Sequence, residues 1–133
     1  MHAENEDIGK LVLRLTLAIL ILFHGINKLI YGISGIEGLV QGVGLPAVLA
    51  YGVYLGEIVG PVLLAVGWYS RVGAAHIVAN MVVAILLVHT GEIFTLANTG
   101  GWALELQGMY LLTAIVFTFV GPGRLSVDHR LGA

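Results

Sequence analysis

The sequence predicts an all-α protein: an integral membrane bundle of four antiparallel helices, with the N-terminus and the C-terminus in the cytoplasm. Hydrophobic residues make up 58% of the chain and charged residues 11%, whereas soluble domains are about half apolar and a quarter charged. The mean hydropathy is +0.95. Four apolar runs, each near the ~20 residues that cross a bilayer as a helix, use nearly the whole length. We therefore expect a single domain over residues 1–133, with the lipid bilayer as its solvent.

Glycine and proline delimit the four runs. We place the helices at about residues 10–31, 46–69, 71–89 and 102–120. Pro46 stands at the helix-starting position that proline tolerates, and Gly121-Pro122-Gly123 ends the fourth run. The third run follows the second almost without a loop, so these two helices are expected to be antiparallel. The acidic N-terminal segment lacks the basic start of a secretory signal, which favours a retained first helix.

The basic residues predict the orientation, because cytoplasmic loops of membrane proteins collect lysine and arginine. With both termini inside, Lys28 is alone on the outer side, and the inner side holds Lys10, Arg14, Arg71, Arg124 and Arg130. This distribution predicts that the loops around Glu37 and around residues 92–98 face the periplasm or the cell exterior. The formal charge of -2 is scattered along the chain, without the basic stripe typical of nucleic-acid binding. We expect no nucleic-acid partner.

The ionisable residues of the first two helices are expected to face inward. At 100° per residue, Arg14, His24 and Lys28 fall on one face of the first helix, and Tyr54 and Glu57 on one face of the second.

Glu57 lies about 16 Å from the start of its helix, near the middle of the bilayer. A charge there costs ~2.5–3.5 kcal/mol, so Glu57 must be paired, neutral or hydrated inside the bundle. Depth along the helices predicts two ion pairs, Arg14 with Glu57 and Lys28 with Glu105.

The later helices carry further polar residues. His76 and Asn80 lie one turn apart on one face of the third helix, while His89 points to nearly the opposite side. His76 and His89 are therefore not expected to bind one ligand together. Trp102 and Glu105 share a face of the fourth helix near its outer end, where aromatic residues anchor membrane proteins.

Each candidate also has a structural interpretation. Arg14 and Glu57 would serve equally well to fix helix register, and Lys28 lies close enough to a helix end for its ammonium to reach water. His24 lies about two turns below the outer surface, as either a hydrogen-bonded structural histidine or one that binds a ligand or carries a proton. The repeat Gly52-x-x-x-Gly56-x-x-x-Gly60 predicts close helix packing, within the bundle or between two copies in a homo-oligomer.

Three segments together resemble the DoxX family. They are the run from Arg14 to Lys28 with its His24-Gly25 pair, the run Gly56-Glu57-x-x-Gly60 that continues to Gly67-x-x-x-Arg71, and the ending Gly121-Pro122-Gly123-Arg124-Leu125-Ser126-Val127-Asp128. The resemblance covers nearly the whole chain, and the C-terminal motif is its most specific part.

The resemblance implies a four-helix inner-membrane protein of a bacterium or archaeon. Some family members are associated with thiosulfate:quinone oxidoreduction, or with membrane complexes that respond to oxidative and thiol stress. This chain has no cysteine, so thiol chemistry would have to reside on a partner.

From these residues we derive a quinone-linked hypothesis. A quinone headgroup requires hydrogen-bond donors at its two carbonyls, a proton route and an apolar pocket. We assign proton chemistry to His24 and Glu57, and ligand binding to Lys28, Tyr54, Glu105 and Trp102. A structural network is assigned to Arg14, His76, Asn80, Arg124 and Asp128. The chain would be a subunit of a quinone-dependent oxidoreductase that receives electrons from a soluble or membrane redox partner.

Two other hypotheses stay open. The chain would serve as a non-catalytic membrane anchor that recruits redox partners, or would bind a lipid-like ligand, with its charges used only for packing. A haem held by two histidines is disfavoured, because His24, His76 and His89 are offset in depth on the predicted helices. We predict no metal site.

Overall fold

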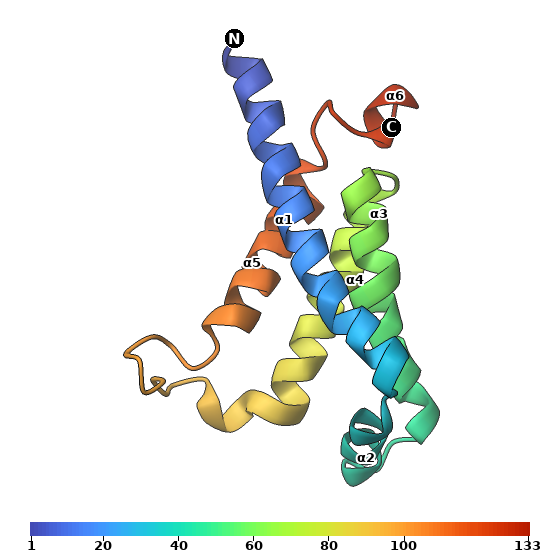
Figure 1. Ribbon diagram of the computed structural model, residues 1–133, viewed down its shortest axis with the longest axis vertical. Helices are drawn as coiled ribbons and strands as arrows, with labels where there is room; N and C mark the ends of the chain where they lie inside the picture. Colours follow the sequence, from blue (N-terminus) through green and yellow to red (C-terminus); the bar gives the residue numbers. More distant parts are fainter.

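The computed structural model describes residues 1–133, and it confirms an all-α membrane protein. Three helical segments are long and apolar enough to cross a membrane: His2–Tyr31, Ala47–Val66 and Ser70–Glu92. A shorter apolar helix, α5 (Glu105–Val120), follows them. Figure 1 shows both termini at one end of the molecule and a short helix, α2 (Ser34–Gly42), at the opposite end. The side of the membrane that each end faces remains a prediction.

The first helix, α1 (His2–Tyr31), ends where the sequence predicted and begins earlier. Gly32 terminates it with a φ of 85°, a backbone conformation that glycine adopts without a side-chain clash. The acidic segment that precedes the apolar run is helical as well. Its Glu4 stands in the first turn, where a negative charge interacts favourably with the helix dipole.

The second apolar run is one continuous helical segment with three different windings. It starts as a 3-10 turn (Ala47–Gly52), widens to a π-helical turn (Leu55–Val59) and ends as α3 (Gly60–Val66). Pro61 has no N–H to donate to the Glu57 carbonyl, and the widened turn lies next to this gap in the hydrogen-bond ladder. The segment stops at Gly67, which adopts a left-handed conformation with a φ of 78°.

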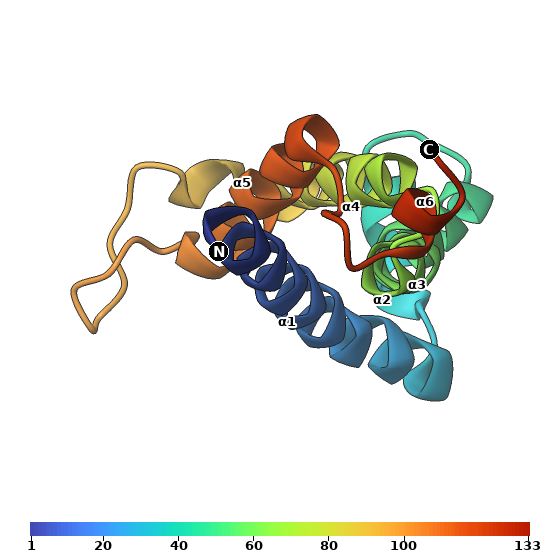
Figure 2. The same cartoon turned by 90° about the horizontal axis from the view of Figure 1, so that it is seen from above.

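The third run folds back after a very short turn. It comprises α4 (Ser70–Ala84), a second π-helical turn (Ile85–His89) and a 3-10 turn (Thr90–Glu92). Tyr69 opens the helix with a φ of 48°, which is unusual for a residue other than glycine. Residues 93–104, part of which we expected to be helical, form a loop that extends away from the body (Figures 1 and 2). The fourth helix is therefore α5, which starts three residues later than expected.

Two short helices were not anticipated. α2 packs through Ile33 and Val40 against Ala50 and forms a small apolar cluster at the end opposite to the termini. α6 (Val127–Arg130) lies in the C-terminal tail, and the Ser126 side chain caps its first turn. Both helices lie next to the glycine-containing stretches that the sequence indicated as the ends of apolar runs.

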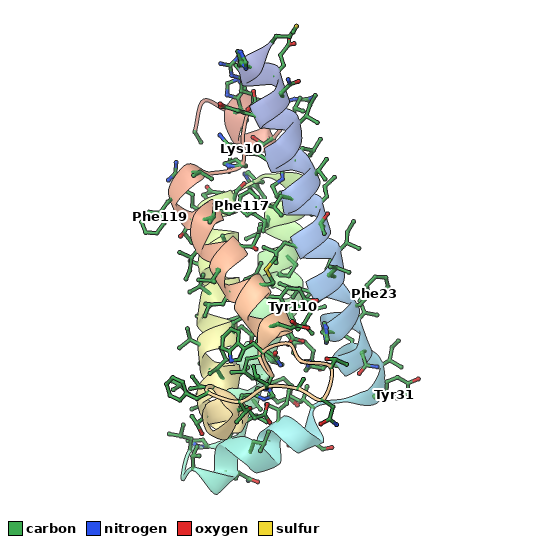
Figure 3. The ribbon with its side chains drawn as sticks, turned by 90° about the vertical axis from the view of Figure 1, so that its left-hand side faces the viewer. Lys10, Phe23, Tyr31, Tyr110, Phe117 and Phe119 are labelled. Atoms are coloured by element: carbon green, nitrogen blue, oxygen red, sulfur yellow. The ribbon has the colours of Figure 1, made fainter.

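The main core joins α1, α3, α4 and α5. Its buried members are Leu17, Ile21, Leu64, Ala74, Ile77, Met81, Tyr110, Ala114 and Phe117. In Figure 3, Tyr110 and Phe117 lie within the bundle, whereas Phe23 and Phe119 point outward. An apolar exterior of this kind is expected of helices that contact acyl chains.

The glycine repeat of the second run packs inside the bundle. A side-chain carbon at Gly56 would overlap the Asn80 side chain, and one at Gly60 would lie 2.7 Å from the Gly73 carbonyl oxygen. Gly52 faces open space. Two of the three glycines thus allow α4 to approach closely. A homo-oligomer through this repeat stays a prediction.

Candidate functional site

Glu57 pairs with Lys28 in the interior of the bundle. The Lys28 Nζ lies 2.6 Å from Glu57 Oε2, and the two side chains are 23% and 9% exposed. The expected pairs, Arg14 with Glu57 and Lys28 with Glu105, are therefore wrong. The long Lys28 side chain extends from the end of α1 toward Glu57. The predicted pairs assumed that each charge lies at the same depth as its own backbone, which does not hold for a lysine.

Two more side chains fix this ion pair. Asn80 of α4 donates a long hydrogen bond of 3.4 Å to Glu57 Oε1. The Tyr54 hydroxyl donates to the Lys28 carbonyl oxygen at 3.0 Å. Each Glu57 oxygen thus has a protein donor from a different helix. The sequence assigned Asn80 to a structural network and Tyr54 to a ligand site, and both adjoin the Lys28–Glu57 pair.

A cavity of about 340 Å³ opens beside the ion pair. Twelve of its 18 lining residues are hydrophobic, and they come from α2, the second run and the α4 segment. Its polar side chains are Lys28, Glu57, His76 and Asn80. His76 approaches the Val72 carbonyl oxygen through Nδ1 at 2.8 Å. We call this space the large cavity.

A smaller cavity of about 130 Å³ also borders Glu57. Its lining residues are Ile21, His24, Glu57, Met81, Ala84, His89, Leu106, Gln107 and Tyr110. The His24 ring meets the Tyr110 ring edge-on, with centroids 6.1 Å apart. His24 and His89, which the sequence placed at different depths, therefore line one space. We call it the small cavity.

Glu57 and Ala84 line both cavities. Both π-helical turns of the chain are close by, since Leu55–Val59 contains Glu57, and Ile85–His89 contributes Leu87 to one cavity and His89 to the other. Such turns are frequent at functional sites because they re-aim side chains. Gln107 and Tyr110 were not predicted as site residues, and His89 was expected only to point away from His76. The three become neighbours when α4 and α5 pack together.

Glu105 and Trp102 do not line either cavity. The Trp102 Nε1 donates to the Ile93 carbonyl oxygen at 2.7 Å, and its ring covers Gly108. Glu105 stands in the first turn of α5 with its carboxylate beside Gly101. Both residues hold the loop of residues 93–104 against α5, so the structure gives them a structural position in place of the expected ligand contact.

Arg14 belongs to a cluster at the terminal end of the bundle. Its guanidinium is 1% exposed. It donates to the carbonyl oxygens of Pro122 at 2.7 Å and Leu125 at 2.9 Å. Arg71 likewise donates to the carbonyl oxygen of Phe119 at the end of α5. The two arginines therefore bind backbone carbonyls of the C-terminal segment.

Asp128 completes this cluster. Its carboxylate accepts hydrogen bonds from the Tyr69 N–H, the Ser70 N–H and the Ser70 hydroxyl at 2.7–2.9 Å. Burial raises the pKa of Asp128, but the hydrogen bonds from Ser70 and Tyr69 and the charge of Arg14 outweigh burial and lower that pKa below its ordinary value. These bonds hold Tyr69 in its left-handed conformation.

Arg124 connects the tail to α1. Its backbone N–H donates to Asp7 Oδ1 at 2.9 Å, and its Nε lies 3.5 Å from Asp7 Oδ2. We call the contacts of Asp7, Arg14, Ser70, Arg124 and Asp128 the C-terminal clasp. The segment Gly121–Asp128, which carries the most specific part of the resemblance, thus serves helix packing and lies at the end of the bundle away from α2 and the large cavity.

Comparison with known proteins agrees with this architecture. The DoxX family model matches residues 9–90. The chain is 30% identical to a Bacillus subtilis protein named "Putative oxidoreductase CatD" over 94% of this chain and 88% of that protein. It is 31% identical to an uncharacterised membrane protein of Mycobacterium tuberculosis over 98% and 85% of the two chains. It is 28% identical to the inner membrane protein YqjF of Escherichia coli over 95% and 94%. No solved structure matches significantly. The chain belongs to the DoxX family of membrane proteins.

Proposed function

We propose that this protein is a quinone-linked subunit of an inner-membrane oxidoreductase system, and that the large cavity holds a quinone headgroup. The observation that supports the proposal most is the Lys28–Glu57–Asn80 cluster in the wall of a mostly apolar space of about 340 Å³. Small-molecule sites typically measure ~300–1,000 Å³ and combine apolar walls with a few polar groups that fix orientation.

The donors of the large cavity fit the headgroup. A quinone presents two carbonyl oxygens on a flat apolar ring. The Lys28 ammonium has three N–H donors, of which Glu57 takes one. The Asn80 amide is held by one long contact to Glu57. Both groups are therefore available to donate to carbonyl oxygens, while the apolar side chains of α2 and α4 cover the ring and an isoprenoid tail.

Glu57 would exchange the protons in this site. A bound quinone supplies two-electron, two-proton chemistry, and electrons would come from or go to a redox partner. The Glu57 carboxylate accepts or releases a proton, and the Lys28 ammonium stabilises its charged form. His24 lines the small cavity and not the large one, so we assign it no contact with the headgroup.

Quinone binding to the purified protein in lipid nanodiscs tests the proposal. A short-tailed quinone should bind, and Asn80→Ala should weaken binding by about tenfold, the value of one to two hydrogen bonds. Glu105→Gln is the matched control, because Glu105 is a carboxylate of α5 that lines neither cavity. Equal quinone affinity of the unaltered protein, Asn80→Ala and Glu105→Gln would reject the large cavity as a quinone site. The absence of quinone binding to any of them would reject it as well.

The apolar majority of the lining residues supports a second candidate, a binding protein for a lipid-like molecule that recruits redox partners without catalysis. Mass spectrometry of small molecules that co-purify with the protein separates the two. A quinone supports the first candidate. A phospholipid or other acyl lipid, displaced only by similar lipids, supports the second.

A further inference from the structure

The small cavity holds polar side chains that the quinone site does not use. It shares Glu57 with the large cavity, and its own lining includes His24, His89, Gln107 and Tyr110. The ionisable groups around the two cavities, besides Glu57, are Lys28, His24, His76, His89 and Tyr110. Glu57 is thus shared by the two cavities, whereas His24, His89, Gln107 and Tyr110 line only the small one.

The volume and polarity of the small cavity suit water. A space of about 130 Å³ accommodates several water molecules. Polar cavities of this kind hold water where 2–4 hydrogen-bonding partners are available. Among the residues that line the small cavity, Glu57 accepts a hydrogen bond from Asn80, and His89 contacts the Gln107 amide. The His24 ring contacts the Tyr110 ring, and its nitrogens make no hydrogen bond within the protein.

His89 connects the small cavity to the end of the molecule that carries α2. The His89 side chain is 24% exposed, and its Nδ1 lies 3.1 Å from the carboxylate of Glu92, which is 50% exposed. On the cavity side, His89 Nε2 lies 3.4 Å from the Gln107 side-chain amide. One tautomer satisfies both contacts, with the proton on Nδ1 donated to Glu92 and Nε2 accepting from Gln107. His89 thus stands between the solvent-exposed Glu92 and the cavity that reaches Glu57.

We propose that the small cavity is a hydrated proton route that connects Glu57 to the membrane surface at the α2 end, with His89 as its entry residue. The proposal rests on the function suggested above for Glu57. A proton that Glu57 accepts from a bound ligand passes to cavity water, from water to His89 Nε2, and from His89 Nδ1 to Glu92 and bulk solvent. This transfer returns the Glu57 carboxylate to its starting state and leaves His89 with its proton on Nε2. Proton exchange with water restores the Nδ1–H tautomer before the next transfer, and no oxidant or reductant is consumed.

Cysteine accessibility tests the hydration of the route. The chain has no cysteine, so each variant carries one unique thiol. Met81→Cys places it on the wall of the small cavity, and Ile77→Cys, one turn away on α4, places it in the dry core. A small cationic methanethiosulfonate reagent added at the α2 side should modify the Met81→Cys variant at least ~10-fold faster, because thiolates form poorly in apolar surroundings. Equal rates, or faster reaction from the side of the termini, would overturn the route.

Infrared spectroscopy of the quinone-free protein tests proton transfer. In oriented proteoliposomes, the band of protonated Glu57, identified by its loss in Glu57→Gln, should follow a pH jump at the α2 side. His89→Phe should slow this response by about tenfold or more, since positioned acid–base groups contribute ~10²–10⁴-fold. Thr90→Val, at an exposed neighbouring position, should leave it unchanged, and Gln107→Met serves as a second variant if the first misfolds.

An unchanged rate in His89→Phe and Gln107→Met would refute the role of His89. Both measurements are made without quinone, so their failure is distinct from a failure to bind quinone in the large cavity. A hydrated small cavity in a protein that binds no quinone would instead support the route and reject the proposed ligand.

Discussion

Gly25 of α1 lies directly against the backbone carbonyl of Glu57, so that a side-chain carbon at Gly25 would overlap the carbonyl oxygen. Pro61, one turn after Glu57, has no N–H, so the same carbonyl also lacks its usual helical hydrogen-bond donor. The absence of a side chain at Gly25 thus lets α1 approach the second run at the residue that carries the buried carboxylate. This approach also brings Lys28, three residues later on α1, within reach of Glu57.

We predict that Gly25→Ala destabilises the bundle by about 1–3 kcal/mol, the usual cost of overpacking. Unfolding from mild detergent into sodium dodecyl sulfate, followed by circular dichroism, measures the change. Gly9→Ala is the control on the same helix, since a carbon there meets nothing within 4 Å. The control should be neutral or stabilising, because alanine favours helix over glycine. Equal effects at the two positions would contradict the close approach.

We predict that Lys28 and Glu57 are strongly coupled. Lys28→Met should cost about 3 kcal/mol or more, because it leaves Glu57 buried without its partner. The double variant Lys28→Met with Glu57→Gln should cost less than the lysine change alone, since replacing both members of a buried pair is often neutral. The same unfolding assay applied to the double-mutant cycle measures the coupling. Additive losses would show that the pair has no energetic role.

We predict that acid weakens the C-terminal clasp through Asp128. The pKa of Asp128 lies below its ordinary value of 3.8 in the folded protein. Its ionised form therefore stabilises the fold above the pKa of the unfolded chain, and this contribution disappears as the pH falls through the folded pKa. Thermal unfolding between neutral pH and about pH 2 should show this loss. Asp128→Asn should be less stable near neutrality and should lack this part of the acid sensitivity; an unchanged acid profile would count against the clasp.

We predict that Arg14→Met releases the C-terminal tail. The variant loses the charged donors to the carbonyls of Pro122 and Leu125, which corresponds to about 2–3 kcal/mol. Limited trypsin cleavage at Arg124 should become faster than in the unaltered protein. Thr16→Val, an exposed change on the same helix, should cleave at the original rate. Slow cleavage of the arginine variant would indicate that other contacts suffice to hold the tail.

The sequence predicted the helices well because their signals are local. Apolar length, Pro46, Gly32 and Gly121 delimit the helices from their own residues, and the boundary at Tyr31 is confirmed. The pairing of charges was predicted poorly. A helical wheel gives the face of Arg14 and Lys28, but not the reach of a long side chain or the relative height of two helices, so both expected pairs were wrong.

The cavities lay beyond sequence reasoning for a related reason. α2 forms part of the wall of the large cavity, but its glycine-rich sequence did not indicate a helix. The small cavity forms only because the packing of α4 and α5 places His89 beside Gln107. Glu57 was identifiable, because an acidic residue at mid-membrane depth must be accommodated. Its position between two separate spaces follows only from the packing of four segments distant along the chain.

The C-terminal clasp has a consequence for biogenesis. The residues that bind Arg14 and cap the turn before α4 are synthesised after all four apolar segments. The earlier helices enter the bilayer with the Arg14 guanidinium and the Ser70 amide still lacking these acceptors. Closure of the bundle at this end must therefore await the synthesis of residues 121–128, and a chain cut short before residue 121 would carry an uncompensated buried cation.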